Sequence, residues 1–233
     1  AGRDYFQISP PAGVEVRYGA FHGAIMGETA AALVLGAARG VIQHAAAMRG
    51  ARASWPRNRF TGRVRTLRGA HVVILGFGAI GHEAGRMLKA FGCRVTGVRR
   101  HPAGDRPAGF DAGDRVGGPS GLDAALADAD HLLCLLPSGP ETDRILDRRR
   151  LALLPSTAFV YNLGRGNAID EAALAEALGA GALAGAFLDV FAEEPLPAES
   201  PLRQAPNAFL YPHVSAVAPE YMLRYVEELA AVL

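Results

Sequence analysis

The chain has 233 residues, of which half are hydrophobic and a fifth are charged. This length allows one large domain, or one domain with part of a second, and the composition is that of a folded globular protein rather than a disordered one. Basic and acidic residues nearly balance, at 24 against 23. This balance gives no reason to expect a nucleic-acid or membrane partner.

The two cysteines, Cys93 and Cys134, each adjoin an apolar run. Two buried thiols in a reducing compartment are favoured over a disulfide. The longest apolar stretch, residues 30–38, is far shorter than the ~20 residues that span a bilayer, and no secretory leader opens the chain. A cytoplasmic protein is therefore expected.

Residues 28–48 are rich in alanine and leucine, contain no proline and precede Gly50. This pattern predicts one long helix that ends at a glycine. Residues 51–68, with Trp55 and six arginines, are expected to form an exposed connecting arm.

From residue 70 onward, short apolar runs typical of strands alternate with helical stretches. The expected strands cover residues 71–75, 93–98, 131–136, 158–163, 183–190 and 208–211, and the expected helices cover residues 79–91, 122–129, 148–154 and 170–178. Strand, helix and strand in repeated succession predict an α/β fold with a doubly wound parallel sheet of the Rossmann type, covered on both faces.

A glycine motif follows the first of these strands and opens the helix after it. Gly76 permits a tight turn, Gly78 lets a ligand approach the backbone, and Gly81 lets the helix pack closely on the strand. The amino end of the helix then faces the pyrophosphate of a dinucleotide. The alternative is a tight turn without a ligand.

The end of the second strand carries information about the cofactor. NAD-binding folds place a carboxylate there, about 20 positions after the glycine motif, to bind the ribose 2′-hydroxyl. This chain has Arg99 and Arg100 instead, and a guanidinium suits a 2′-phosphate. NADP(H) is favoured over NAD(H), the alternative being that both arginines are only a solvated strand end.

Four stretches carry a resemblance to a known family. They are the glycine motif at residues 76–81, residues 135–142 (Leu-Leu-Pro-Ser-Gly-Pro-Glu-Thr), residues 162–166 (Asn-Leu-Gly-Arg-Gly), and residues 188–213 from Leu-Asp-Val-Phe to Pro-His. In order and spacing the chain resembles the D-isomer-specific 2-hydroxyacid dehydrogenases from about residue 14 to 219. Within that family the likeness is greatest to glyoxylate/hydroxypyruvate reductases.

Three residues are the expected catalytic groups. His213 follows the last strand at the carboxyl edge of the sheet and is suited to deliver a proton, because imidazole titrates near neutrality. By resemblance, Glu194 pairs with His213, and a nearby carboxylate favours the imidazolium. Arg165 would bind the substrate carboxylate and polarise its keto oxygen. Each residue alone also fits an ordinary turn or surface position.

The resemblance implies further cofactor contacts. Asp189 is expected to hold the nicotinamide carboxamide. The remaining expected contacts are Ala79 and Ile80 with the three glycines at the pyrophosphate, Leu136, Pro137 and Thr142 beside the adenosine, Arg99 and Arg100 at the ribose, and Leu163, Gly164, Arg165 and His213 elsewhere along the cofactor. No metal site is expected.

Other residues are given structural roles. His22 and Glu28 lie where the family enters its interdomain helix, and a structural role is favoured for both, with the cleft as the alternative for His22. Tyr161, Phe187 and Phe191 fall in apolar runs and are expected in the core.

The resemblance also implies a domain layout that includes part of a flavodoxin-like substrate-binding domain. Residues 1–27 would be the remnant of that domain, residues 28–68 an interdomain helix and dimerisation arm, residues 69–212 the dinucleotide-binding domain, and residues 213–233 the return to the substrate-binding domain. A homodimer is expected, with Trp55 as an anchor, unless the arm folds back on its own domain. Since family members are longer, a truncated chain is expected.

The leading hypothesis is a reductase of small 2-oxo acids, such as glyoxylate or hydroxypyruvate, that uses NADP(H) or NAD(H). The alternative is a non-catalytic, dinucleotide-sensing protein similar to the corepressors that share this scaffold. Formate dehydrogenase is disfavoured because that enzyme pairs its histidine with glutamine, and this chain has Glu194. Phosphoglycerate oxidation is disfavoured because Arg99 argues against NAD.

Overall fold

The computed structural model describes residues 11–14, 16, 19–50, 64–102, 107 and 109–231. Within this part of the chain, seven parallel strands form one sheet in the order β3-β2-β1-β4-β5-β6-β7. The strands are β1 (His71–Leu75), β2 (Arg94–Val98), β3 (Arg115–Gly117), β4 (His131–Cys134), β5 (Phe159–Asn162), β6 (Gly185–Leu188) and β7 (Ala208–Leu210). The predicted doubly wound parallel sheet is confirmed.

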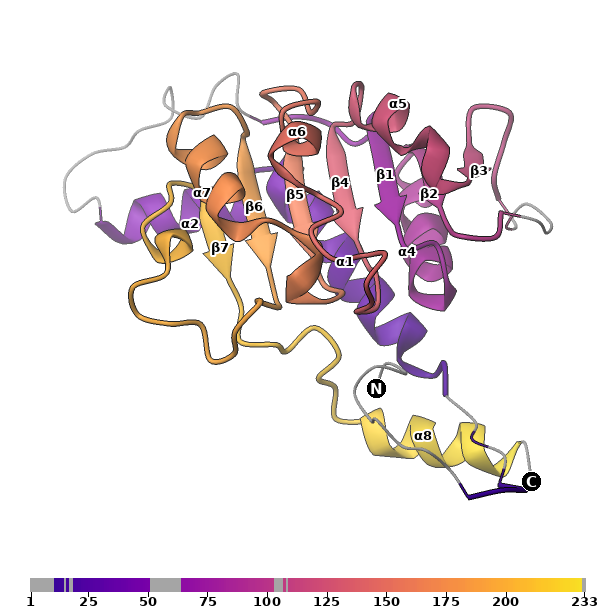
Figure 1. Cartoon of the computed structure of the whole chain (residues 1–233). Helices are drawn as coiled ribbons and strands as arrows, with labels where there is room; N and C mark the ends of the chain where they lie inside the picture. The colour runs from indigo at the N-terminus through magenta and orange to yellow at the C-terminus, as the bar shows by residue number, and fades with distance from the viewer. Residues whose placement is uncertain are drawn as a thin grey trace.

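Helices cover both faces of this sheet (Figure 1). The α-helices are α1 (His22–Ala38), α2 (Val41–Gly50), α4 (Ala79–Ala90), α5 (Leu122–Leu126), α6 (Arg148–Leu151), α7 (Glu171–Gly179) and α8 (Tyr221–Ala230). One apolar core lies between the sheet and α5, α6 and α7, and a second lies between the sheet and α1 and α4. Because the central strands are buried on both faces, they read as continuous apolar runs.

Core predictions are confirmed at single residues. Tyr161 and Phe187 are fully buried with their rings stacked, and Phe191 is also buried. Cys93 and Cys134 are buried free thiols, and burial raises the pKa of each to about 11.

The single helix predicted over residues 28–48 is wrong. The helix begins earlier, at His22, and ends at Ala38, after which Gly40 adopts a left-handed conformation with φ +64° and α2 begins at Val41. Glycine reaches this conformation without the steric cost that other residues meet. The alanine-rich sequence therefore forms two helices.

The connecting arm is described only at its end. Trp55 and the rest of residues 51–63 lie outside the described residues. After them, the Arg65 amide donates to the Ala38 carbonyl oxygen at 2.8 Å, and Leu67 is buried. The last part of the arm therefore returns to the domain from which it leaves.

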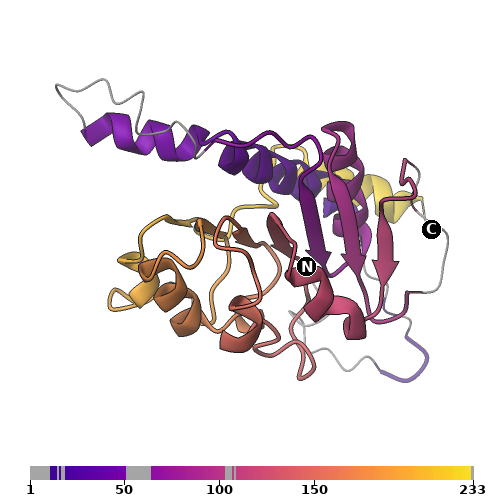
Figure 2. The ribbon, with the colours of Figure 1, turned by 90° about the horizontal axis from the view of Figure 1, so that it is seen from above.

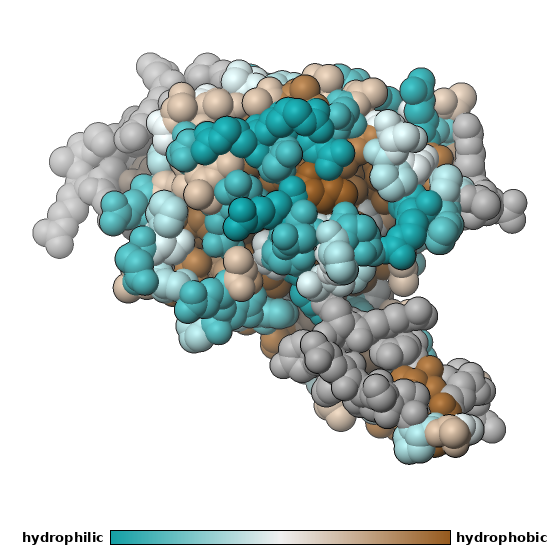
Figure 3. Space-filling model, viewed as in Figure 1, coloured by the Kyte–Doolittle hydropathy of each residue, from teal (hydrophilic) through white to brown (hydrophobic). Residues whose placement is uncertain are grey.

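The carboxyl ends of all the strands lie at one edge of the sheet, the lower edge in Figure 1. Helix α8 lies beyond this edge, and none of its residues is buried. Exposed hydrophobic side chains, including Met222, Leu223 and Val226, gather on it (Figure 3). In open α/β folds this edge is where ligands bind.

His131, the first residue of β4, is a buried titratable group. Its side chain is stacked against Phe159, and its Nδ1 lies 2.9 Å from the hydroxyl of the fully buried Tyr161. Burial lowers the pKa of His131 from its ordinary 6.5 to about 4. The folded protein therefore holds this ring neutral at neutral pH.

This burial predicts a pH dependence of stability. Since the folded pKa of His131 lies below the unfolded one, the unfolded chain binds more protons between the two values, and stability is lost as pH falls through that window. Between about pH 7.5 and 4.5, His131 should lower the free energy of unfolding by roughly 2 kcal/mol. Urea unfolding at a series of pH values should show a shallower slope for His131→Gln, with exposed His101→Gln as the control. Equal slopes in all three proteins would exclude this role for His131.

Candidate active site

The turn between β1 and α4 requires two of its glycines for packing. Gly76 has φ +98°, and a Cβ there would lie 2.7 Å from the Leu135 carbonyl carbon. A Cβ on Gly81 would lie 2.9 Å from the Gly76 oxygen and 3.2 Å from Ile74 Cγ2. The predicted roles of these glycines, a tight turn and a close helix–strand contact, are thus what the geometry requires.

Gly78 is different, because nothing lies within 4 Å of where its Cβ would be. It is the N-cap residue of α4, and no side chain caps the helix there. The amides of the first helical turn are therefore open to an acceptor from outside the chain. Packing does not require a glycine at this position, so the free space beside it is suited to a ligand.

His213 and Glu194 form a hydrogen-bonded pair on loops that leave the carboxyl edge. His213 has φ +56° and follows the short segment after β7, and its Nδ1 lies 2.8 Å from Glu194 Oε2. The other Glu194 oxygen accepts the Phe191 amide at 3.0 Å. Because an ionised carboxylate only accepts, Nδ1 carries the proton of this bond, and Nε2 is the nitrogen left to exchange a proton.

Arg165 lies in the turn after β5. Its Nη1 donates to the Gly164 oxygen at 2.9 Å. Asn162 holds this turn, because its side chain donates to the Arg165 oxygen at 3.0 Å and accepts the Gly164 amide at 3.2 Å. A Cβ on Gly164 would lie 2.5 Å from the Leu136 oxygen, so the turn packs directly on the loop after β4.

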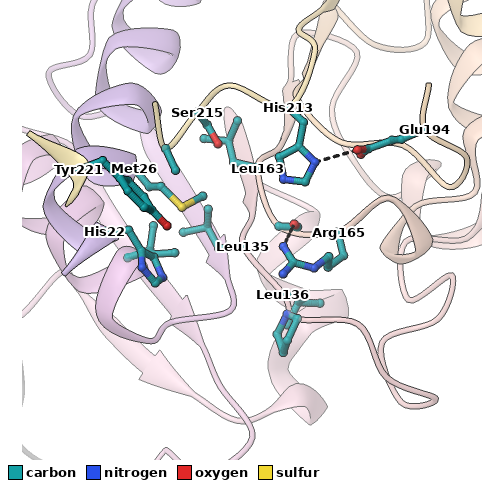
Figure 4. Close-up of a pocket in the computed structure, with 14 residues that line it drawn as sticks. His22, Met26, Leu135, Leu136, Leu163, Arg165, Glu194, His213, Ser215 and Tyr221 are labelled. Carbon is teal, nitrogen blue, oxygen red and sulfur yellow. Dashed lines mark hydrogen bonds and ion pairs between the residues drawn. The ribbon is translucent and has the colours of Figure 1, made fainter. Parts of the chain in front are cut away.

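These three predicted catalytic residues line one cleft of about 530 Å³. Ile80 at the start of α4 lines it too, with Leu136, Pro137, Leu163 and Gly164. Figure 4 shows Arg165 and His213 on one side, and His22, Met26 and Tyr221 facing them from the other. The cleft therefore joins the glycine turn to the residues predicted for catalysis.

The far wall of the cleft was not predicted as a functional surface. For His22 a structural role was favoured and the cleft was the alternative. Its ring lines the cleft, and its buried Nδ1 has no hydrogen-bond partner in the described part of the chain. Burial lowers the pKa of His22. Glu28, in contrast, is exposed on α1 and is not part of this lining. Tyr221, which belongs to α8, carried no signal in its local sequence.

Two residues predicted to contact a cofactor lie beneath the cleft surface. Asp189 is 1% exposed, and its carboxylate accepts the amides of Val214 at 2.8 Å and Ser215 at 2.9 Å. Thr142 is also buried, and its hydroxyl lies 2.8 Å from the Pro137 oxygen, to which it donates. Both side chains hold loops of the site, and their cofactor contacts stay predictions.

The two arginines after β2 have different surroundings. Arg99 is half-buried, and its positive charge adds to burial in lowering the pKa of His82. Arg100 is more exposed and forms an ion pair with Glu141 from the loop after β4. Two cations thus stand where NAD-binding folds place a carboxylate.

The described residues contain no group of three or more metal-ligating side chains placed to hold a metal ion. Among the helices described, none has the length and apolar character needed to cross a membrane.

Residues 31–215 match the sequence model of the NAD binding domain of D-isomer specific 2-hydroxyacid dehydrogenases. Glyoxylate/hydroxypyruvate reductase B of Pectobacterium carotovorum is 44% identical over 99 residues, which are 42% of this chain and 31% of the relative. The same enzyme of Yersinia enterocolitica is 39% identical over 150 residues, 63% of this chain and 44% of the relative. The matches span from 31% to 51% of the curated relatives' length.

Solved structures agree with this match. A D-isomer specific 2-hydroxyacid dehydrogenase from Xanthobacter autotrophicus, in complex with NADPH, is 31% identical with a TM-score of 0.78 over 96% of this chain and 88% of that chain. An NADPH-dependent glyoxylate/hydroxypyruvate reductase from Sinorhizobium meliloti is 30% identical with a TM-score of 0.73, over 92% of this chain and 66% of that chain. The chain belongs to the D-isomer specific 2-hydroxyacid dehydrogenase family and contains its NAD binding domain.

Proposed function

We propose that the protein transfers a hydride between NADP(H), or less readily NAD(H), and a small 2-oxo or 2-hydroxy acid such as glyoxylate or hydroxypyruvate. The observation that carries this proposal is that Arg165, Glu194 and His213 line one cleft with the first turn of α4. Relatives named glyoxylate/hydroxypyruvate reductase support the substrate class. Family membership alone leaves the substrate open, since a D-3-phosphoglycerate dehydrogenase is also similar.

The glycine turn fits the pyrophosphate of a dinucleotide. The open space at Gly78 and the uncapped amides of α4 offer the two features that a bound diphosphate needs, close backbone approach and hydrogen-bond donors. When bound, the nicotinamide supplies the hydride. The chain holds the substrate and supplies the proton.

His213 is the proton donor in the direction of reduction. Because Nδ1 is bonded to Glu194, the Nε2–H of the imidazolium is the group that can protonate the developing alkoxide oxygen. In oxidation, neutral Nε2 accepts the hydroxyl proton. Glu194 keeps the ring in this orientation and stabilises its charge, and the Phe191 amide in turn holds Glu194.

Arg165 binds the substrate carboxylate. Its guanidinium has five donors in a planar arrangement, of which Nη1 donates to the Gly164 oxygen. The planar guanidinium suits a carboxylate and also stabilises negative charge that develops on the keto oxygen. A lysine would keep the charge but lose the paired geometry.

Arg99 and Arg100 support the preference for NADP(H). A 2′-phosphate gains charge-assisted hydrogen bonds from guanidinium groups, whereas a 2′-hydroxyl gains little from them. Two structural relatives are complexes with NADPH or NADP. In this proposal the adenosine half lies beside Leu136 and Pro137, which line the cleft, and the nicotinamide carboxamide lies beside Asp189.

The proposed domain layout assigns residues 1–27 and 213–233 to a substrate-binding domain. Segments of both contact each other, since the Glu228 carboxylate accepts the amides of Ala20 at 2.8 Å and Phe21 at 2.9 Å. The Phe21 ring also packs edge-on against Tyr221, with centroids 4.8 Å apart. These contacts support one unit beyond the carboxyl edge of the dinucleotide-binding domain at residues 69–212.

A second copy of this chain is the proposed partner, through residues 28–68. Helix α2 points away from the sheet (Figure 2), and Val41 and Met48 are exposed on it. Two unpaired thiols, Cys93 and Cys134, support a reducing compartment, so the cytoplasm is the proposed location.

His213→Ala should lower kcat by about 10²- to 10⁴-fold, the usual contribution of a general acid, while the Kd for NADPH changes less than about twofold. NADPH oxidation with glyoxylate, hydroxypyruvate and pyruvate measures kcat, and calorimetry measures the Kd for NADPH. Glu194→Gln should also lower kcat. Glu193→Gln, a change at the exposed neighbouring residue, is the matched control. A wild-type protein that binds NADPH but turns over none of these acids would instead be a sensor.

Gly78→Ala and Gly76→Ala should separate binding from folding. Since the Gly78 Cβ meets no protein atom, its alanine variant should keep its stability to within about 1 kcal/mol yet bind NADPH at least about tenfold more weakly. Gly76→Ala should instead lose roughly 2 kcal/mol or more, because φ is positive and the backbone of Leu135 is too close. Unaltered NADPH affinity in Gly78→Ala would mean that no ligand occupies that space.

Arg99→Asp should shift cofactor preference toward NADH. Loss of a charge-assisted bond, and repulsion between carboxylate and phosphate, should weaken NADPH binding by about 10- to 100-fold, while the new carboxylate can accept from the ribose hydroxyl. The ratio of the two dissociation constants is the measurement. A ratio equal to that of the wild type would remove Arg99 from the cofactor site.

A further inference from the structure

An ion pair joins two loops at the edge where the adenosine half of the cofactor is placed. Arg100 follows β2, Glu141 lies in the loop after β4, and the guanidinium of one contacts the carboxylate of the other. In the sheet, β2 and β4 are the two neighbours of β1. The pair therefore extends across the carboxyl end of β1, where the glycine turn begins.

Glu141 is the better anchored partner. Its loop is a tight turn in which the Thr142 amide donates to the Gly139 oxygen at 3.0 Å and the Thr142 hydroxyl donates to the Pro137 oxygen at 2.8 Å. The carboxylate also lies over Gly139, whose Cβ position is 3.1 Å from Glu141 Oε2. Buried Thr142 holds the turn that carries the Glu141 carboxylate, and the exposed Arg100 side chain extends to that carboxylate.

The two arginines at the end of β2 differ in whether a carboxylate balances their charge. In the part of the chain that the structure describes, no carboxylate pairs with Arg99, whereas the charge of Arg100 is balanced by Glu141. Both members are more than half exposed, at 63% and 53%. An exposed pair of this kind is weak, so a competing anion can separate it.

We infer that Glu141 is a specificity-determining residue that acts through Arg100, a conclusion that rests on the dinucleotide function proposed above. A 2′-phosphate must compete with the Glu141 carboxylate for Arg100 and is also repelled by it. A neutral 2′-hydroxyl neither competes for the Arg100 guanidinium nor is repelled by Glu141. Glu141 therefore reduces the preference for NADPH over NADH that Arg99 and Arg100 would otherwise confer, and it allows both nucleotides to be used.

The test is to measure the Kd values of NADPH and NADH by calorimetry, without substrate or turnover. Glu141→Gln should bind NADPH about threefold to fivefold more tightly, the scale of an exposed ion pair. Its affinity for NADH should change less than about twofold. Asp143→Asn is the matched control, since Asp143 is exposed on the same loop and forms no ion pair among the described residues. It should leave the ratio of the two constants unchanged.

Two further variants test whether the effect passes through Arg100. In an Arg100→Ala background, Glu141→Gln should no longer alter the NADPH/NADH ratio, and Glu141→Asp should give a ratio between wild type and Glu141→Gln. Thermal unfolding should show the same midpoint for Glu141→Gln and wild type, which separates charge competition from loop damage.

The outcomes distinguish this inference from the proposed function. If the wild type binds both nucleotides but Glu141→Gln weakens NADPH, shifts both constants equally or acts without Arg100, then only the role of Glu141 is overturned. If the wild type binds neither nucleotide, the dinucleotide function is overturned together with it.

Discussion

The carboxylate of Asp189 determines where the loop of His213, the proposed proton donor, lies. It stands one residue beyond β6, is almost fully buried, and accepts the amides of Val214 and Ser215 at 2.8 and 2.9 Å. These are the two residues that follow His213, whose own amide donates to the Asp189 backbone oxygen at 2.9 Å. The Ser215 oxygen accepts the Thr29 hydroxyl of α1 at 2.9 Å. Through Ser215, the buried Asp189 side chain thus connects the His213 loop to the helix that carries the opposite wall of the cleft, and hydrogen bonds are stronger where water is excluded.

Local pattern was sufficient for most of the fold. The alternation of apolar runs with helical stretches predicts a parallel sheet because each strand buried on both faces must be continuously apolar, and the central strands are. The roles of Gly76 and Gly81 follow equally from sequence, since the turn leaves no room for a Cβ at either position. The meeting of Arg165, Glu194 and His213 in one cleft followed from family resemblance, because no spacing rule brings together residues that lie 19 to 48 positions apart in the sequence.

Elements that depend on tertiary contacts were missed. Strand β3 has three residues, none of them buried, and exists because its backbone pairs with β2, so no apolar run signals it. The break at Gly40 was hidden in an alanine-rich stretch in which a single glycine is usually tolerated. His22 reads as an ordinary helix-entry residue, and only the packing of α1 and α8 around the cleft makes it part of the wall. The Arg100–Glu141 pair joins residues 41 positions apart, and its existence depends on strand order rather than on either local sequence.

The site has two ends, one at His213, Glu194 and Arg165 and one at Arg100 and Glu141. They are held by different kinds of interaction, and the difference follows from the proposed role of each end. In the proposed reaction, proton and hydride transfer require reacting atoms held within a fraction of an ångström. At that end the fold uses partly buried hydrogen bonds: Asp189 to the His213 loop, Asn162 to the Arg165 turn and Phe191 to Glu194. Recognition of a ribose substituent would require only a local balance of charge, and at the proposed ribose end the chain has the exposed side chains of Arg100 and Glu141. If the proposed function holds, substitutions at the ribose end should therefore alter which nucleotide binds without moving Arg165, Glu194 or His213, whereas substitutions of the hydrogen-bonding residues at the other end should displace those groups.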